Sequence, residues 1–223
     1  MHQQISKKII IYLFIFLLLG TFNNKNLLLL SFETTNYFEV KDLSETKNDK
    51  IIQDLSKLND RNLFILKKNQ VIEAINSHKI VESFFVFKNY PSNLNIKIEK
   101  TKFLAITKKD GLDYFVGSNG NLIKMEDINK NLPYIFGDIK VLDFLKLKNI
   151  IDNSNFDYDQ IKNLYYFKSK RWDIETKDGL IINLPSNDIK NSFVILSRIQ
   201  QDKNFNHYKN IDLRQQNQII VNE

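Results

Sequence analysis

The sequence predicts an α+β protein with a single amino-terminal transmembrane helix, a small module of two helices and three strands, and then a mixed β-domain with flanking helices. Three patterns lead to this prediction. An uncharged apolar run begins at Ile9. Within Leu94–Glu99, apolar and polar residues alternate with the period of a half-buried strand. Within Asp188–Gln201, apolar residues recur at the spacing of one helix face.

The composition limits the chemistry that the chain can carry. Its 223 residues include 32 Lys+Arg and 26 Asp+Glu, for a formal net charge of +6, and no cysteine. The lack of cysteine excludes disulfide-stapled folds, thiolate metal sites and a cysteine nucleophile. Part of the positive charge comes from lysines that flank the first apolar run, and the rest is spread thinly along the chain. The charge therefore does not indicate a nucleic-acid partner.

The amino terminus predicts a membrane anchor over residues 9–30, preceded by a cytoplasmic tail of residues 1–8. A helix that spans a bilayer needs about 20 apolar residues. The clean run ends at Phe22, so Leu27–Leu30 would complete the span. No small-x-small cleavage motif follows the run, and two lysines in the tail place the amino terminus on the cytoplasmic side. A cleaved signal peptide and a buried core helix are the alternatives.

The next segment, residues 36–103, is predicted to form a compact module with the order strand, helix, helix, strand, strand. A polar turn at Ser44–Asn48 separates the first strand from the first helix, and Asn48 is a candidate amino-terminal cap. The expected strands are 37–43, 80–87 and 94–99, and the expected helices are 49–58 and 69–77.

The remaining segment, residues 104–223, is richer in strands. Gly117–Gly120 imitates a phosphate-binding loop, but no helix follows it, so we interpret it as a hairpin turn. The last two strands form a hairpin. The first expected strand, 103–107, begins at the boundary with the preceding module. The other expected strands are 114–116, 121–124, 161–169, 171–176, 180–184, 208–213 and 218–221. The expected helices are 140–149 and 188–201.

Motifs for enzymatic chemistry are missing from the sequence. His2, His78 and His207 are far apart and none stands in a metal-binding frame. No nucleophile-elbow, Walker A or dinucleotide-binding motif is present. These observations predict no metal, no cofactor and no small-molecule substrate.

Two other groups of residues have plain structural interpretations. Asp152, Asp157 and Asp159 lie in a polar connection, where solvated loop carboxylates are the usual case, whereas a glycosidase needs two carboxylates held in a cleft. The aromatic and basic stretch Tyr165–Trp172 is typical of a strand with aromatics toward the core and lysines toward water. We therefore interpret Trp172 as a core residue, not a base-stacking one.

Taken in order, several short phrases of the sequence resemble the FtsQ/DivIB family of bacterial cell-division proteins over nearly the whole chain. Each phrase is degenerate alone, and their order and spacing carry the resemblance. The phrases are Val81-Glu-Ser-Phe-Phe-Val86, Tyr90-Pro91, Leu94-Asn-Ile-Lys-Ile-Glu99, Gly117-Ser-Asn-Gly120, Leu132-Pro133 with Gly137, Trp172-Asp-Ile174 with Asp178-Gly179 and Leu184, and Ile211-Asp-Leu-Arg214.

The sequence also departs from the usual pattern of that family. Proline is usual where Lys79 and Lys102 stand, arginine where Phe87 stands, and aspartate where Gly117 stands. The predicted cytoplasmic tail is short for the family. These departures concern contacts at single positions and leave the architecture unaffected.

The resemblance implies a POTRA domain at residues 36–103 and a β-domain at residues 104–223. It implies a non-enzymatic scaffold of the divisome in the cytoplasmic (inner) membrane at the division septum, with the two domains in the periplasm. The implied partners are small bitopic division proteins of the FtsB and FtsL type, and the implied docking mode is strand addition at the carboxy-terminal edge. The corresponding residues here are Arg214, Gln215, Gln216, Gln218, Ile219, Ile220 and Val221.

Physical chemistry agrees with an edge of this kind, because a terminal strand leaves one row of backbone donors and acceptors for another chain. On that basis, a proline at Ile220 is expected to abolish partner capture. Two other functions stay open as alternatives. One is a membrane-anchored envelope enzyme that acts on peptidoglycan, and the other is a transport-type POTRA chaperone.

Overall fold

The structure is a computed structural model, and it describes residues 7–22, 37–41, 45–58, 66–90, 93–125, 131–203, 205–215 and 218–222. The chain separates into two compact units. The first comprises residues 1–75 with 85–97, and the second comprises residues 76–84 with 98–223. The predicted domain boundary after residue 103 stays a prediction.

The first helix, α1 (Lys7–Phe22), contains the apolar run that the sequence analysis assigned to a membrane anchor. Among the helices in the described part of the chain, none combines the length and apolar content that crossing a membrane requires. The second part of the predicted span, residues 23–30, lies outside the described residues.

A three-stranded sheet with two helices follows, in the predicted order strand, helix, helix, strand, strand. The sheet order is β1-β3-β2, with β1 parallel to β3. Buried apolar side chains from both helices and from β3 form the core, as the alternation in β3 predicted. The elements are β1 (Tyr37–Lys41), α3 (Glu45–Ser56), α4 (Lys68–Asn76), β2 (Val81–Asn89) and β3 (Asn93–Lys100).

The start of α3 differs from the prediction. The helix begins at Glu45, so Asn48 lies inside it and is not its cap. The polar composition of this segment led to the prediction of a turn. However, it contains neither proline nor glycine, the two residues that strongly oppose a helix, so the helix extends through it.

The second unit contains a nine-stranded sheet with the order β12-β11-β10-β9-β8-β7-β4-β5-β6. The strands predicted at 161–169, 171–176 and 180–184 correspond to β8, β9 and β10, which pair in sequence as a meander, and β11 and β12 form the predicted terminal hairpin. The strands are β4 (Phe103–Lys109), β5 (Leu112–Gly117), β6 (Leu122–Lys124), β7 (Tyr134–Phe136), β8 (Ile161–Tyr166), β9 (Trp172–Thr176), β10 (Ile181–Asn183), β11 (Asn210–Asp212) and β12 (Ile220–Asn222).

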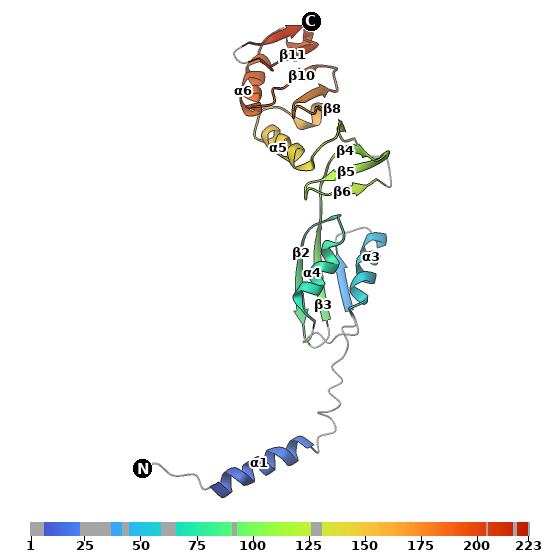
Figure 1. Ribbon diagram of the computed structural model, residues 1–223, viewed down its shortest axis with the longest axis vertical. Helices are drawn as coiled ribbons and strands as arrows, with labels where there is room; N and C mark the ends of the chain where they lie inside the picture. The colour runs from blue at the N-terminus through green and yellow to red at the C-terminus, as the bar shows by residue number, and fades with distance from the viewer. Residues whose placement is uncertain are drawn as a thin grey trace, which may run out of the picture. The chain divides into compact units, whose positions relative to one another are not determined.

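Two helices, α5 (Val141–Asp152) and α6 (Ile189–Ile199), lie on one side of strands β8, β10 and β11 (Figure 1). Phe144 of α5 and Leu196 of α6 are completely buried in the main apolar cluster. Trp172 belongs to the same cluster with 2% of its surface exposed. This confirms its interpretation as a core residue.

Strand β7 was not predicted. It is parallel to both β4 and β8, and it joins the two halves of the sheet. With three residues directly after Pro133, it is too short to show a period of two.

The segment Gly117–Gly120 is a turn between β5 and β6, as predicted. The Asn119 Nδ2 atom donates to the carbonyl oxygens of Lys79, at 2.9 Å, and Val81, at 2.8 Å. A Cβ atom at Gly117 would lie 2.7 Å from Asn119 Oδ1. Glycine at this position, where the resembling family usually has aspartate, thus leaves room for the Asn119 side chain.

The sheet face away from the helices carries a polar cluster around Glu175. Its carboxylate accepts hydrogen bonds from Asn163 Nδ2 at 2.9 Å, Tyr165 Oη at 2.6 Å and Lys162 Nζ at 2.9 Å. These donors, Asn163 first, lower the pKa of Glu175 to about 2. The same contact raises the pKa of the Tyr165 hydroxyl.

The Glu175 cluster predicts a loss of stability in acid. The pKa is lower in the folded chain than its ordinary value of 4.5, so the contribution is present above about pH 4.5 and is lost as the pH falls toward 2. We expect Glu175→Gln to be less stable than wild type at pH 7 by about 1–2 kcal/mol. The difference should narrow at pH 3 in urea unfolding followed by circular dichroism. Asp178→Asn, which removes an exposed carboxylate from the next turn, is the control, and an equal pH response in the two variants would contradict this assignment.

Candidate partner-binding edge

Strand β12 is one edge of the nine-stranded sheet. It pairs only with β11 in the part of the chain that the structure describes, in antiparallel register. Ile220 and Val221 lie in this strand, and Gln218 and Ile219 lead into it. Arg214 and Gln215 follow β11 on the other side of the connection, and Gln216 lies outside the described residues.

The hydrogen bonds of β11 determine which backbone groups of β12 face outward. The Ile181 N–H donates to the Lys209 carbonyl at 2.9 Å, and the Leu213 N–H donates to the Asn183 carbonyl at 2.9 Å. The Lys209 carbonyl and the Leu213 N–H therefore face β10, as does the backbone of Ile211 between them, whereas the Lys209 N–H donates to the Asn222 carbonyl of β12 at 2.8 Å. Because backbone groups alternate along a strand, residues 210 and 212 face β12.

The same alternation applies to β12. Ile220 pairs with Asp212, and Asn222 pairs with Asn210, so the backbone groups of Ile220 and Asn222 face β11. The N–H and C=O groups of Val221, which lies between them, point to the free edge. This changes the expectation for Ile220. A proline there would remove a donor that holds β12 to its own sheet, whereas a proline at Val221 would remove a donor that faces outward.

Val221 also ends a row of apolar side chains that crosses the sheet. It lies opposite Ile211, and the register continues this row through β10, β9, β8 and β7. Val221 is 41% exposed, whereas the other members of the row are at most 1% exposed. The row consists of Val221, Ile211, Ile182, Ile174, Leu164 and Ile135.

The side chains before Val221 add to the apolar character of this edge. Ile219 is 47% exposed and Ile220 is 52% exposed. Three consecutive exposed aliphatic side chains on an edge strand without lysine or proline leave that edge open to pairing. The docking of a partner on this edge stays a prediction.

Arg214 forms an ion pair with Asp212 of β11. Its guanidinium Nε donates to Asp212 Oδ1 at 2.8 Å and to Oδ2 at 2.9 Å, and its backbone N–H also donates to Asp212 at 3.0 Å. The side-chain hydrogen bond from Arg214 lowers the pKa of Asp212 and raises the pKa of Arg214. Arg214 therefore fixes the end of β11, directly before the connection to β12.

An open groove of about 520 Å³ lies beside Arg214 and Gln215. Its lining includes Arg171 and the first turn of α6, which the sequence analysis did not connect with the carboxy terminus. Arg171 is itself paired with Asp173, 3.2 Å away. No sequence motif could have predicted this groove, because its walls come from segments that only the sheet topology brings together.

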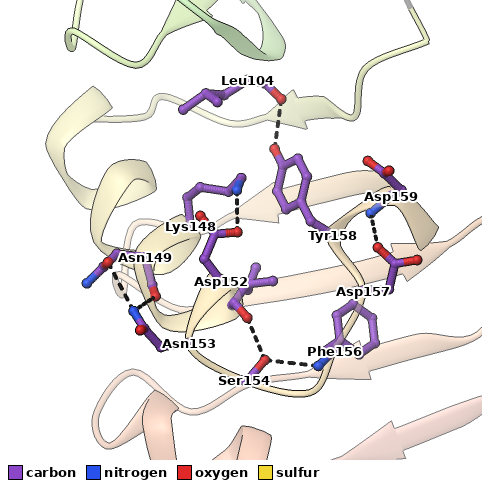
Figure 2. A network of polar contacts seen from close by, with 11 residues as sticks. Leu104, Lys148, Asn149, Asp152, Asn153, Ser154, Phe156, Asp157, Tyr158 and Asp159 are labelled. Atoms are coloured by element: carbon purple, nitrogen blue, oxygen red, sulfur yellow. Dashed lines mark hydrogen bonds and ion pairs between the residues drawn. The ribbon is translucent and has the colours of Figure 1, made fainter.

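The three aspartates considered for an enzymatic site lie around the end of α5, in a short connection whose own residues form hydrogen bonds with one another (Figure 2). Asp152 forms an ion pair with Lys148. Asp157 accepts a hydrogen bond from the Asp159 N–H at 2.9 Å and caps a turn of 3-10 helix, η1 (Tyr158–Gln160). The described residues contain no group of three or more His, Asp or Glu side chains that could hold a metal ion.

Tyr158 ties this connection to β4. Its hydroxyl donates to the Leu104 carbonyl at 2.8 Å (Figure 2), and Leu104 lies where the register between β4 and β5 shifts. The Lys148 Nζ atom lies 4.2 Å from the centre of the Tyr158 ring. Burial is the main cause that raises the pKa of the Tyr158 hydroxyl above its ordinary value.

We expect Tyr158→Phe to destabilise the second unit by about 1–2 kcal/mol, because the Leu104 carbonyl loses a partly buried donor. Trp172 is the single tryptophan of the chain and is buried in this unit, so its fluorescence during urea unfolding measures the effect. Tyr166→Phe, which removes a hydroxyl bonded to Asp143 at 3.1 Å, is the matched control and should cost less. If both substitutions had the same small effect, the Leu104 contact would not be structurally important.

Comparison with known protein families identifies both parts of the chain. The family described as "POTRA domain, FtsQ-type" matches residues 34–100. The family described as "Cell division protein FtsQ/DivIB, C-terminal" matches residues 105–214. The second match ends before β12, so it covers Arg214 but not the other predicted site residues.

Individual relatives give the same result. The chain is 26% identical to the cell division protein FtsQ of Bradyrhizobium diazoefficiens, over 71% of this chain and 48% of that protein. It is 28% identical to the cell division protein DivIB of Clostridium tetani, over 56% and 48% of the two chains. For DivIB of Bacillus subtilis the identity is 27%, over 56% and 47%. The chain thus spans about half the length of the curated relatives that it matches.

Proposed function

Because this chain belongs to the FtsQ/DivIB family of bacterial cell-division proteins, we propose that it is a non-enzymatic scaffold of the divisome. In this proposal, residues 9–30 anchor it in the cytoplasmic membrane at the septum, with residues 1–8 in the cytoplasm. Both folded units lie in the periplasm. There they bind small bitopic division proteins of the FtsB and FtsL type and so link early and late components of the division machinery.

The observation that carries the proposal is the outward-facing backbone of β12. A partner segment in extended conformation would accept from and donate to Val221, which adds a tenth strand to the sheet. The added strand would also cover the exposed aliphatic side chains of Ile219, Ile220 and Val221. Burial of apolar surface contributes about 25 cal/mol per Å², so these side chains supply part of the binding free energy.

The apolar row gives the partner segment a sequence preference. A residue of the partner that pairs with Val221 would extend the row of Ile211 and Ile182 by one position. Side chains on one face of neighbouring strands are in contact. An aliphatic residue at that position of the partner is therefore favoured over a charged one.

Depletion of the protein tests the proposed function in cells. We expect depleted cells to grow into filaments, and a fluorescent fusion to the amino terminus to concentrate at the division site. Cells that divide at normal length after depletion, with an evenly spread fusion, would rule out the scaffold. A catalytic role would instead require lost activity on a defined peptidoglycan substrate.

A further inference from the structure

We propose that the hairpin end of the first unit rests on the surface of the membrane beside the anchor. The inference rests on the proposed anchor at residues 9–30 and adds a second membrane contact to it. The contact is made by a set of exposed aromatic and basic side chains, which we call the hairpin surface. It consists of Phe85, Phe87, Tyr90, Lys67 and Lys68.

The aromatic part of the hairpin surface lies on β2 and on the turn that follows it. Phe85 is 60% exposed, and Phe87 and Tyr90 are each 57% exposed. Phe85 and Phe87 alternate with the half-buried Phe84 and Val86, so they point away from the core. Strand β2 is also an edge of its sheet. Water is an unfavourable environment for large aromatic side chains, so this exposure calls for an apolar neighbour.

The register of the sheet places the membrane anchor at the same end. Strand β1 is parallel to β3, and Tyr37 pairs with Asn93, the first residue of β3 after the hairpin. The chain therefore enters the first unit next to the hairpin. Seven residue steps separate residue 30 from Tyr37, and an extended chain covers at most about 3.3–3.6 Å per step. The entry point thus stays within about 25 Å of the end of the anchor.

Basic side chains also lie at the hairpin end of the first unit. The Lys88 Nζ atom donates to the Leu66 carbonyl at 2.9 Å, which ties the residues before α4 to the end of β2. Lys67 and Lys68 follow directly, and both are exposed. Lysines with aromatic residues are the combination that settles at a bilayer interface, where rings lie at headgroup depth and cations attract anionic lipids.

A weak contact is sufficient here, because the anchor holds the hairpin surface close to the bilayer. A tethered second contact forms within one molecule, so its effective concentration is high. The occupant of this surface is therefore an anionic lipid headgroup layer. A protein partner on the same surface is the competing explanation, and the experiment below separates the two.

The chain contains no cysteine, so single nitroxide labels can be placed without removing native thiols. We suggest Asn89→Cys at the hairpin and Asn76→Cys as the matched control, since both residues are exposed and Asn76 ends the helix α4 whose first residue, Lys68, belongs to the hairpin surface. The full-length protein is reconstituted in vesicles of phosphatidylcholine and phosphatidylglycerol. Label accessibility to oxygen, which prefers lipid, is compared with accessibility to a water-soluble nickel chelate.

We expect the ratio of oxygen to nickel accessibility to be several-fold higher at position 89 than at position 76. The double substitution Phe85→Ser with Phe87→Ser should lower the ratio at position 89 to that at position 76. Replacing phosphatidylglycerol by phosphatidylcholine should lower it in part, because the lysines lose their anionic partners.

Equal, water-like ratios at both positions in a protein that floats with the vesicles would overturn the membrane contact and leave the anchor intact. A protein that fails to float with the vesicles would overturn the anchor, and the contact with it. If the label at position 89 became shielded only after a division partner was added, the hairpin surface would be a protein interface and the membrane contact would be wrong.

Discussion

Val221→Pro is expected to abolish capture of a bitopic FtsB-type partner while leaving the fold intact. The N–H of Val221 points to the free edge of the sheet, so the substitution removes no internal hydrogen bond. Proline is tolerated on edge strands when its nitrogen faces solvent. It also blocks the approach of a new strand on that side. We expect affinity to fall at least about tenfold, which corresponds to 1.4 kcal/mol, in pull-down of the full-length protein.

Two further substitutions complete this test. Val221→Ala keeps the backbone donor and removes only the exposed aliphatic side chain, so it should weaken capture less than Val221→Pro. Ile220→Pro should lower the stability of β12 itself, because the Ile220 N–H faces Asp212. Capture by Val221→Pro at wild-type strength would exclude strand addition at β12 as the binding mode.

Gly137→Ala is expected to destabilise the second unit by more than about 3 kcal/mol. Gly137 has φ = +107°, and an added Cβ atom would lie 2.2 Å from the Tyr166 carbonyl oxygen. The neighbour is backbone of β8, which cannot move without breaking its pairing with β7 and β9. The fluorescence of Trp172 during urea unfolding reports the loss directly.

Gly179→Ala separates the two causes of this effect. Gly179 has φ = +88°, but no atom lies within 4 Å of the site of its missing Cβ. Gly179→Ala therefore introduces backbone strain but no steric clash. We expect the free energy of unfolding to fall by about 1–2 kcal/mol. Equal losses at the two glycines would show that the contact with Tyr166 contributes nothing.

Much of the fold could be predicted, because long elements carry a clear period. Alternation in β3 and helical spacing in α6 gave both elements to within two residues. The short strand β7 has no period of its own, and its place between β4 and β8 depends on parallel pairings over long sequence separations. The early start of α3 was missed because polar residues in the absence of proline and glycine are compatible with both a turn and a helix.

The candidate site was predictable only as a segment. The sequence indicates an apolar terminal strand, but it does not determine which backbone groups of that strand face outward. That depends on the pairing of β10 with β11 and of β11 with β12, where a shift of one residue would exchange Ile220 and Val221. The roles of Arg214 and of the groove beside it also depend on contacts with Asp212 and Arg171, which sequence spacing alone does not define.

The short length of β12 has a thermodynamic consequence for the carboxy terminus. Only three residues hold this strand to the sheet, and its aliphatic side chains are about half exposed to water. A ligand that binds only the ordered form of a segment shifts that segment toward order, by an amount that grows with ligand concentration. The amides of Ile220 and Asn222 face β11 and would not contact the partner, yet their hydrogen exchange should slow when it binds. Pairing of β12 with its own sheet and binding of a partner strand to its free edge are then two parts of one coupled equilibrium.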